Sequence, residues 1–133
     1  MASGVDMRST RATALGWRGP AACASLVAAV LLMPGVSGSA RVVVLLALAP
    51  LLEELVFRAG LHESLLRRLR SPLVANALTA LVFALAHVLV RGEAAAFAVV
   101  LPALLIGIVY QRWRRVWPCA LLHAAMNAIW LAV

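Results

Sequence analysis

Charged residues, and acidic ones above all, are scarce in this sequence. Of its 133 residues only five are Asp or Glu and only 13% are charged, whereas 65% are hydrophobic and the mean hydropathy is +1.00. A soluble domain is usually about 45–50% apolar, and a chain this short has too much surface for its volume to hide the excess in a core. The composition therefore excludes an ordinary soluble domain and predicts one compact unit embedded in a lipid bilayer.

Lysine is missing altogether, so all 12 basic residues are arginines, and the net charge is +7. In a soluble chain a balance this basic would suggest nucleic acid as a partner. Here the arginines lie between apolar runs, which is typical of residues that set membrane topology. We therefore expect the bilayer as a partner and no nucleic acid.

Cysteine is nearly absent too. Cys23 and Cys119 both lie in apolar segments, and the sequence has neither a CxxC spacing nor an HExxH motif. We expect both cysteines to be small buried side chains. No metal or other cofactor is predicted.

What the sequence does contain is a series of five apolar segments, several of them close to the ~20 residues that a spanning helix needs. They cover residues 19–33, 42–69 (with an amphipathic end), 72–90, 94–110 and 116–133. The expected fold is all-α, a polytopic membrane helix bundle of about five transmembrane helices. Residues 17–133 would form a single domain after a cytoplasmic tail at residues 1–16.

Residues 19–33 admit a second interpretation. Arg8, Arg11 and Arg18 precede this apolar stretch and small residues follow it, which is also the pattern of a secretory signal peptide. We favour a retained helix because the rest of the chain is itself embedded in the membrane.

The arginines divide unevenly between the two sides of such a bundle. One side would hold Arg8, Arg11, Arg18, Arg67, Arg68, Arg70, Arg112, Arg114 and Arg115, and the other only Arg41 and Arg91. Because positive loops stay in the cytoplasm, this distribution predicts an N-terminus inside and a C-terminus outside.

Strongly polar residues inside the apolar segments are costly, at about 2.5–3.5 kcal/mol for a central charge, so they mark function or neutralised pairs. Glu54 and Arg58 lie four residues apart and can form an ion pair on one helix face. Glu53 points to a different face, which leaves a membrane carboxylate free to act elsewhere. Asn76 is expected to make a helix-to-helix hydrogen bond, and His62 to lie on a solvated face.

Two histidines extend this pattern. His87 lies in an otherwise apolar helix, and His123 and Asn127 are four residues apart, so their side chains share a face. With Glu53 they offer a base, imidazoles and hydrogen-bond donors on three helices. Attack of water on an amide needs such a set, to activate the water and to stabilise the oxyanion.

Three short motifs carry a family resemblance. Residues 53–58 match EExxxR, residues 83–87 match FxxxH and residues 123–127 match HxxxN. In this order, over a core of residues 41–133, they resemble the CAAX-protease and bacteriocin-processing (CPBP) family of glutamic intramembrane proteases. One departure is Ala59, where the family often has glycine after the arginine.

The resemblance implies a role for each matched residue. Glu53 would be the general base, His87 would help to hold and activate the water, and His123 with Asn127 would stabilise the oxyanion. Glu54 and Arg58 would be supporting residues, and Arg58 could also contact substrate. The implied substrate is a membrane-anchored protein or peptide, similar to those of short bacterial members that process C-terminal sorting helices. The same resemblance implies a bacterial inner membrane as the location.

Three alternatives remain open. A zinc protease could use one glutamate and two histidines as ligands, a small transporter could use Glu53 as an ion site, and an immunity or scaffold protein could keep the fold without catalysis. The site is also expected in the outer half of the membrane. His87 lies four residues from Arg91, or roughly 6 Å along a helix, in a bilayer core about 30 Å thick.

Overall fold

The computed structural model describes residues 38–132, and all of the regular structure in this range is helical, without strands. The all-α class is therefore confirmed. The tail expected at residues 1–16, the helix expected at 19–33 and Cys23 lie outside the described residues. The number of about five membrane helices and the single-domain boundary stay predictions.

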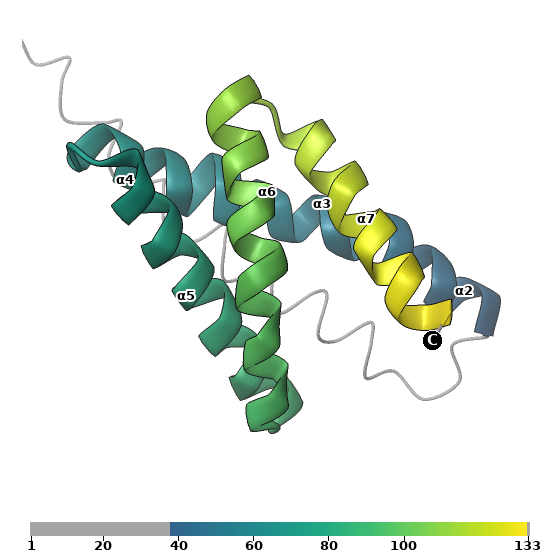
Figure 1. The fold of residues 1–133 in the computed structure, drawn as a ribbon. Helices are drawn as coiled ribbons and strands as arrows, with labels where there is room; N and C mark the ends of the chain where they lie inside the picture. Colours follow the sequence, from purple (N-terminus) through teal and green to yellow (C-terminus); the bar gives the residue numbers. More distant parts are fainter. Residues whose placement is uncertain (1–37, 133) are drawn as a thin grey trace, which may run out of the picture.

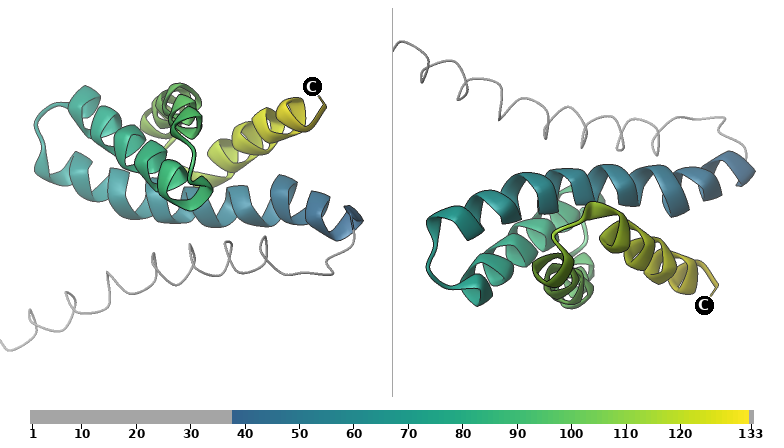
Figure 2. Two further views of the ribbon diagram at one scale, coloured as in Figure 1. Left: turned by 90° about the horizontal axis from the view of Figure 1, so that it is seen from below. Right: turned by 90° about the horizontal axis from the view of Figure 1, so that it is seen from above.

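One long helix opens the described chain and runs without a break from Gly38 to Arg68 (Figures 1 and 2). Its consecutive parts are α2 (Gly38–Val43), η1 (Val44–Leu48), α3 (Ala49–Glu54), η2 (Leu55–His62) and α4 (Glu63–Arg68). The parts η1 and η2 are π-helical, with wider turns that often mark functional positions in helices. They flank α3, the turn that carries Glu53 and Glu54.

Three more helices follow, with ends that the sequence explains. The helix α5 (Pro72–Arg91) begins at Ser71, whose side chain accepts a hydrogen bond from the Val74 amide, and stops at Gly92 in the left-handed region. The short η3 (Ala94–Val99) leads into α6 (Val100–Trp113), and α7 (Val116–Ala132) ends the described chain. The expected boundaries agree with these within a few residues.

The packing of the helices brings the three motifs together. Both views in Figure 2 show α6 almost end-on while the long helix lies in the plane, so the two cross steeply. The helix α5 packs against α6 and against η2, whereas α7 returns along α3 and η1. The element α3 packs against α7, and α5 reaches both through the side-chain contacts of His87 with Glu53 and of Phe83 with His123. In Figure 1, α6 lies between α5 and α7.

The outside of this bundle is apolar and its interior is partly polar. Large hydrophobic side chains such as Leu89 and Trp130 are 83% and 75% exposed, whereas Glu54 and Arg58 are fully buried. Two helices, Pro72–Arg91 and Ala94–Trp113, are long and apolar enough to cross a membrane, and only 33% and 28% of them is buried inside the molecule. The core helix of a soluble protein would be mostly buried, so these surfaces are suited to lipid.

Polar contacts gather the arginine-rich turns at one end of the bundle. The Glu63 carboxylate pairs with Arg67 at 3.1 Å and with Arg114 at 2.7 Å, and it accepts a hydrogen bond from the Tyr110 hydroxyl. Burial raises the pKa of Glu63, but the hydrogen bonds from these three residues outweigh it and lower the pKa below its usual value. The turns after α4 and after α6 thus lie together, as the arginine pattern predicts, and Arg91 ends α5 at its opposite end.

Asn76 joins two helices as expected. Its side-chain amide donates to the Leu104 carbonyl of α6 at 3.0 Å. Gly107 makes room for this contact, because a Cβ there would collide with the Asn76 side chain. Thr79 differs, since its hydroxyl donates within α5 to the Ala75 carbonyl.

Candidate active site

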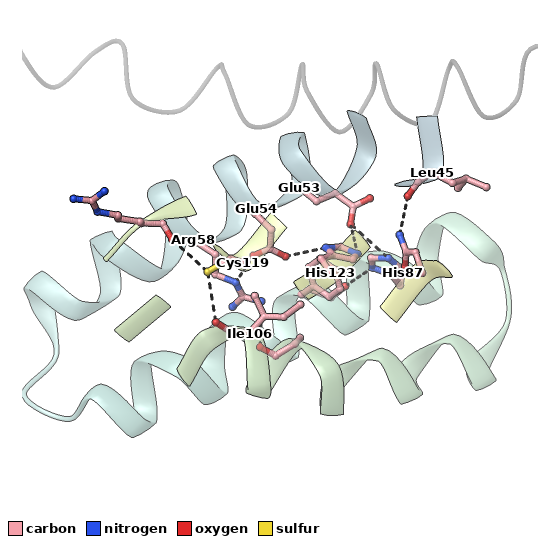
Figure 3. Close-up of polar contacts among 12 residues, drawn as sticks. Leu45, Glu53, Glu54, Arg58, His87, Ile106, Cys119 and His123 are labelled. Carbon is pink, nitrogen blue, oxygen red and sulfur yellow. Dashed lines mark hydrogen bonds and ion pairs between the residues drawn. The ribbon is translucent and has the colours of Figure 1, made fainter. Parts of the chain in front are cut away.

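Glu53 faces two histidines from different helices. Its Oε2 lies 3.7 Å from Nε2 of His123 and 3.9 Å from Nε2 of His87 (Figure 3). This oxygen has no hydrogen-bond partner among residues 38–132. Both distances exceed a direct hydrogen bond and are of the length that a bridging group spans. The free carboxylate inferred from the sequence is therefore directed at both imidazoles.

The orientation of His87 comes from its own motif. Its Nδ1 lies 3.0 Å from the Phe83 carbonyl, and because a carbonyl only accepts, Nδ1 carries the hydrogen. The neutral ring then presents the lone pair of Nε2 to Glu53. The Phe83 ring also packs on His87, with centroids 4.3 Å apart, and meets the ring of His123 edge-on at 5.9 Å. Phe83 thus positions both imidazoles.

The orientation of His123 comes from Glu54. Nδ1 of His123 lies 2.9 Å from Oε1 of Glu54, and the other oxygen of Glu54 accepts from Nε of Arg58 at 2.7 Å. The expected ion pair of Glu54 and Arg58 is confirmed. Because a carboxylate oxygen paired in this way accepts hydrogen bonds, His123 donates from Nδ1 and presents Nε2 to Glu53. Glu54 therefore has a second partner that lies 69 positions away in the sequence.

Arg58 supports this arrangement from behind. It is fully buried, and its Nη2 donates to the Ala103 carbonyl of α6 at 3.1 Å. It is not among the residues that line the cavity beside the histidines. Arg58 therefore fixes Glu54 and has no direct route to a substrate in this cavity.

Asn127 is attached to the long helix at a carbonyl that the helix itself cannot use. Its Nδ2 donates to the Leu45 carbonyl at 3.0 Å. In the π-helical stretch η1 the partner of that carbonyl would be residue 50, five positions on, but Pro50 has no amide hydrogen. Pro50 thus frees the Leu45 carbonyl, and Asn127 takes it. The second hydrogen of the Asn127 amide remains for another acceptor.

A cavity of about 480 Å³ lies beside this group. His87, His123 and Asn127 form part of its wall, and Arg91 and Glu93 line it near the turn between α5 and η3. The rest of the wall is mainly apolar, contributed by η3, α6 and the end of α7. Glu53 is not a lining residue, but it lies against the two imidazoles that are.

Cys119 lies near His123 in the sequence but does not bond to it. Cys119 is buried, as expected, and its thiol contacts the Ile106 and Arg115 carbonyls rather than His123, one helical turn away. Among residues 38–132, no group of three or more His, Cys, Asp or Glu could hold a metal ion.

The expectation for His62 was wrong. Its side chain has no solvent exposure, because it stacks against Tyr110 and contacts Gln111 of α6 instead of facing water. The amphipathic end of the long helix turns this histidine inward.

The helices have an apolar exterior and enclose buried carboxylate and imidazole groups. The chain is therefore a helical membrane protein with a site of the kind that enzymes use. Comparison with protein families identifies it more closely. The family model of type II CAAX prenyl endopeptidase Rce1-like proteins matches residues 35–129, most of the chain, so the chain belongs to this family. Its activity is in general terms that of an intramembrane endopeptidase, with a peptide or protein as substrate. No curated protein and no solved structure matches the chain.

Proposed function

We propose that this protein hydrolyses a peptide bond near a membrane-anchored segment with a water molecule activated by Glu53. One observation carries the proposal: the Glu53 carboxylate oxygen faces the Nε2 atoms of His87 and His123 at 3.9 and 3.7 Å. Both imidazoles are fixed so that Nε2 accepts, so three acceptors surround one point. A water held there could donate one hydrogen to Glu53 and the other to an imidazole, and keep a lone pair for attack.

The proton balance of the reaction follows from these roles. Glu53 takes a proton from the water as its oxygen bonds to the carbonyl carbon, and the carbonyl oxygen becomes the oxyanion. Glu53 then returns the proton to the leaving amine as the C–N bond breaks. The free hydrogen of Asn127 would donate to the oxyanion, and so would Nε2 of His123 in the protonated form of its ring.

Replacing Asn127 with alanine is expected to lower turnover by about 10²–10³-fold, the usual effect of losing one oxyanion donor. Substrate binding should change much less, because the donor acts mainly in the transition state. The values of kcat and KM for cleavage of a membrane-embedded peptide measure both effects. Met126→Ala, a change in the same cavity wall that removes no donor, is the matched control. A rise in KM with unchanged kcat would make Asn127 a substrate contact instead.

The substrate can be found through the new N-termini that cleavage creates. Protein N-termini are labelled in membranes from cells that make either the wild-type protein or the Glu53→Gln variant, and are identified by mass spectrometry. We expect new termini at the edge of an apolar segment only with the wild-type protein. Identical sets of termini in both membranes would contradict the proposed activity.

We further propose that the cavity opens on the outer side of a bacterial inner membrane, in a bundle of about five helices with its N-terminus inside. The cavity is lined by Arg91 and Glu93, whereas the arginine-rich turns meet at the other end of α5. Because those turns should remain cytoplasmic, exported proteins with a C-terminal sorting helix fit this site better than cytosolic tails do.

Thiol labelling tests this orientation. In a protein with Cys23 and Cys119 replaced by alanine, a single cysteine is placed at Ala95, which lines the cavity, or at Ser71, beside the arginine-rich turns. A membrane-impermeant maleimide added outside intact cells should label Ala95→Cys, and Ser71→Cys should react only after the cells are opened. The reverse pattern would invert the orientation and remove the export-linked role.

A zinc-dependent protease is the second candidate. Its support is that His87 and His123 are each held through Nδ1 with Nε2 toward a carboxylate, an arrangement common around zinc. Against it, the described residues form no group that could hold a metal ion. Measurement of bound metal in the purified protein separates the two candidates: stoichiometric zinc with all of the activity dependent on it would favour this second one.

A further inference from the structure

A chain of buried polar side chains leads away from His123 toward the arginine-rich end of the bundle. His123 bonds to Glu54, Glu54 bonds to Arg58, and His62 follows Arg58 one turn later in the long helix (Figure 3 shows the first part). Glu54, Arg58 and His62 have no solvent exposure. Groups this costly to bury need partners for all of their polar atoms.

Three polar atoms at the far end of this chain lack partners among the described residues. They are Nη1 of Arg58, Nδ1 of His62 and Oδ1 of Asn76, and all three belong to side chains that are at most 2% exposed. Arg58 and Asn76 otherwise use their remaining polar atoms on carbonyls of α6 or on Glu54. The three unpaired atoms therefore belong to side chains of η2 and α5 that contact α6.

The contacts with α6 place these three side chains along one side of that helix. Arg58 bonds to the Ala103 carbonyl and Asn76 to the Leu104 carbonyl, and His62 contacts Gln111 two turns on. Asn76 also packs against the bare Cα of Gly107, which lies between these positions. Residues three and four apart share a face of a helix, so the three partners are neighbours along one side of α6.

The chemistry of the unpaired atoms is that of a site for one water molecule. Gln111 donates through Nε2 to the Pro72 carbonyl at 2.6 Å, and its second hydrogen faces Nε2 of His62 at 3.2 Å. Nε2 of His62 then accepts, so its Nδ1 carries the hydrogen. Arg58 and His62 each offer a donor, and a water molecule has two lone pairs that can accept from them. Oδ1 of Asn76 offers an acceptor for one of the hydrogens of that water.

We propose that His62 and Asn76 are positioning residues that bind one buried water, which holds the free Nη1 of Arg58 and thereby fixes Glu54 and the ring of His123. The water accepts from Arg58 and from His62 and donates to Asn76. The expected effect of this water on turnover rests on the proposed function. Its expected effect on the orientation of the His123 ring does not.

Nitrogen NMR of the full chain tests this without a substrate. The protein has three histidines, so a sample with ¹⁵N-labelled histidine in detergent micelles contains three imidazole rings, and single substitutions assign them. The side-chain nitrogen of asparagine can take the place of Nδ1 of His62, and the side-chain nitrogen of glutamine can take the place of Nε2. We expect His62→Gln to shift the Nδ1 signal of His123, and His62→Asn to leave that signal as in the wild type.

Thr79→Val is the matched control, because Thr79 is a buried residue of α5 whose hydroxyl bonds only within its own helix. It should leave the His123 signal unchanged. Equal shifts with His62→Gln and His62→Asn, or no shift with either, would overturn the proposal, because packing alone would not distinguish the two nitrogens. Where a catalysed cleavage is available, His62→Gln should lower kcat with little change in KM, and His62→Asn should restore it.

A second readout uses the unsubstituted protein. In NMR spectra of this protein, magnetisation should pass from a long-lived bound water to the Nδ1 hydrogen of His62. If His62→Gln does not fold, this transfer decides alone: its presence supports the water site, and its absence overturns it. Loss of proteolysis in Glu53→Gln bears on the proposed function only, so failure of one proposal is distinguishable from failure of the other.

Discussion

Replacing Glu53 with glutamine is expected to abolish hydrolysis of a membrane-embedded peptide while the helical content stays the same. Glutamine keeps the shape of the side chain but cannot take a proton from water. General base catalysis alone is worth about 10²–10⁴-fold in rate, so the purified variant should lose at least this much. Cleavage rates in lipid nanodiscs measure the loss, and circular dichroism checks the fold.

Glu93→Gln is the control for this experiment. Glu93 also carries a carboxylate at the cavity, but it lies outside the group formed by Glu53, His87 and His123. This variant should keep most of its activity. Near-normal cleavage by Glu53→Gln in purified protein would remove Glu53 as the base.

Replacing Glu54 with glutamine is expected to destabilise the fold itself. The change leaves the fully buried Arg58 without its counter-charge, and breaking a buried pair in this way typically costs about 3–5 kcal/mol. Glutamine also has only one acceptor oxygen for two donors, Nε of Arg58 and Nδ1 of His123, so the hold on His123 weakens and activity should fall together with stability. Unfolding in mixed micelles with increasing denaturing detergent measures the free energy of unfolding.

The double variant Glu54→Leu with Arg58→Met separates the two effects. It removes both buried charges and replaces them with apolar groups of similar size, which is often neutral or stabilising. Its stability should therefore recover most of the loss, whereas its activity should not, because His123 still lacks its acceptor. A Glu54→Gln variant as stable as the wild type would show that the pair contributes little to the fold.

Much of the fold could be predicted from the sequence because lipid imposes a simple rule. A run of apolar residues in a membrane has to become a helix, which pairs every backbone amide internally, so composition and breakpoints alone predicted the helices from Pro72 onward. Spacing of four residues also predicted the Glu54–Arg58 pair, since both partners share one helix. The motif residues could be recognised for the same reason: they are the polar exceptions within apolar runs.

Contacts between helices could not be predicted in this way. The bond from Glu54 to His123 joins positions 69 apart, and periodicity within a helix carries no information on which helices meet. The burial of His62 was missed because its charged neighbours Glu63 and Arg67 suggest a solvated surface, although His62 lies four residues from Arg58 and shares its buried face. The link from Asn127 to the Leu45 carbonyl had one available signal, the missing amide hydrogen of Pro50.

The most direct test of a carboxylate mechanism is hydrolysis by metal-free protein. The purified wild-type protein is stripped with a strong chelator, its metal content is measured, and its cleavage of a membrane-embedded substrate is compared with that of Glu53→Gln. If Glu53 activates the water between His87 and His123, the stripped wild-type protein keeps its full rate and Glu53→Gln shows none. Loss of cleavage on stripping, with recovery in proportion to added zinc, would contradict this mechanism.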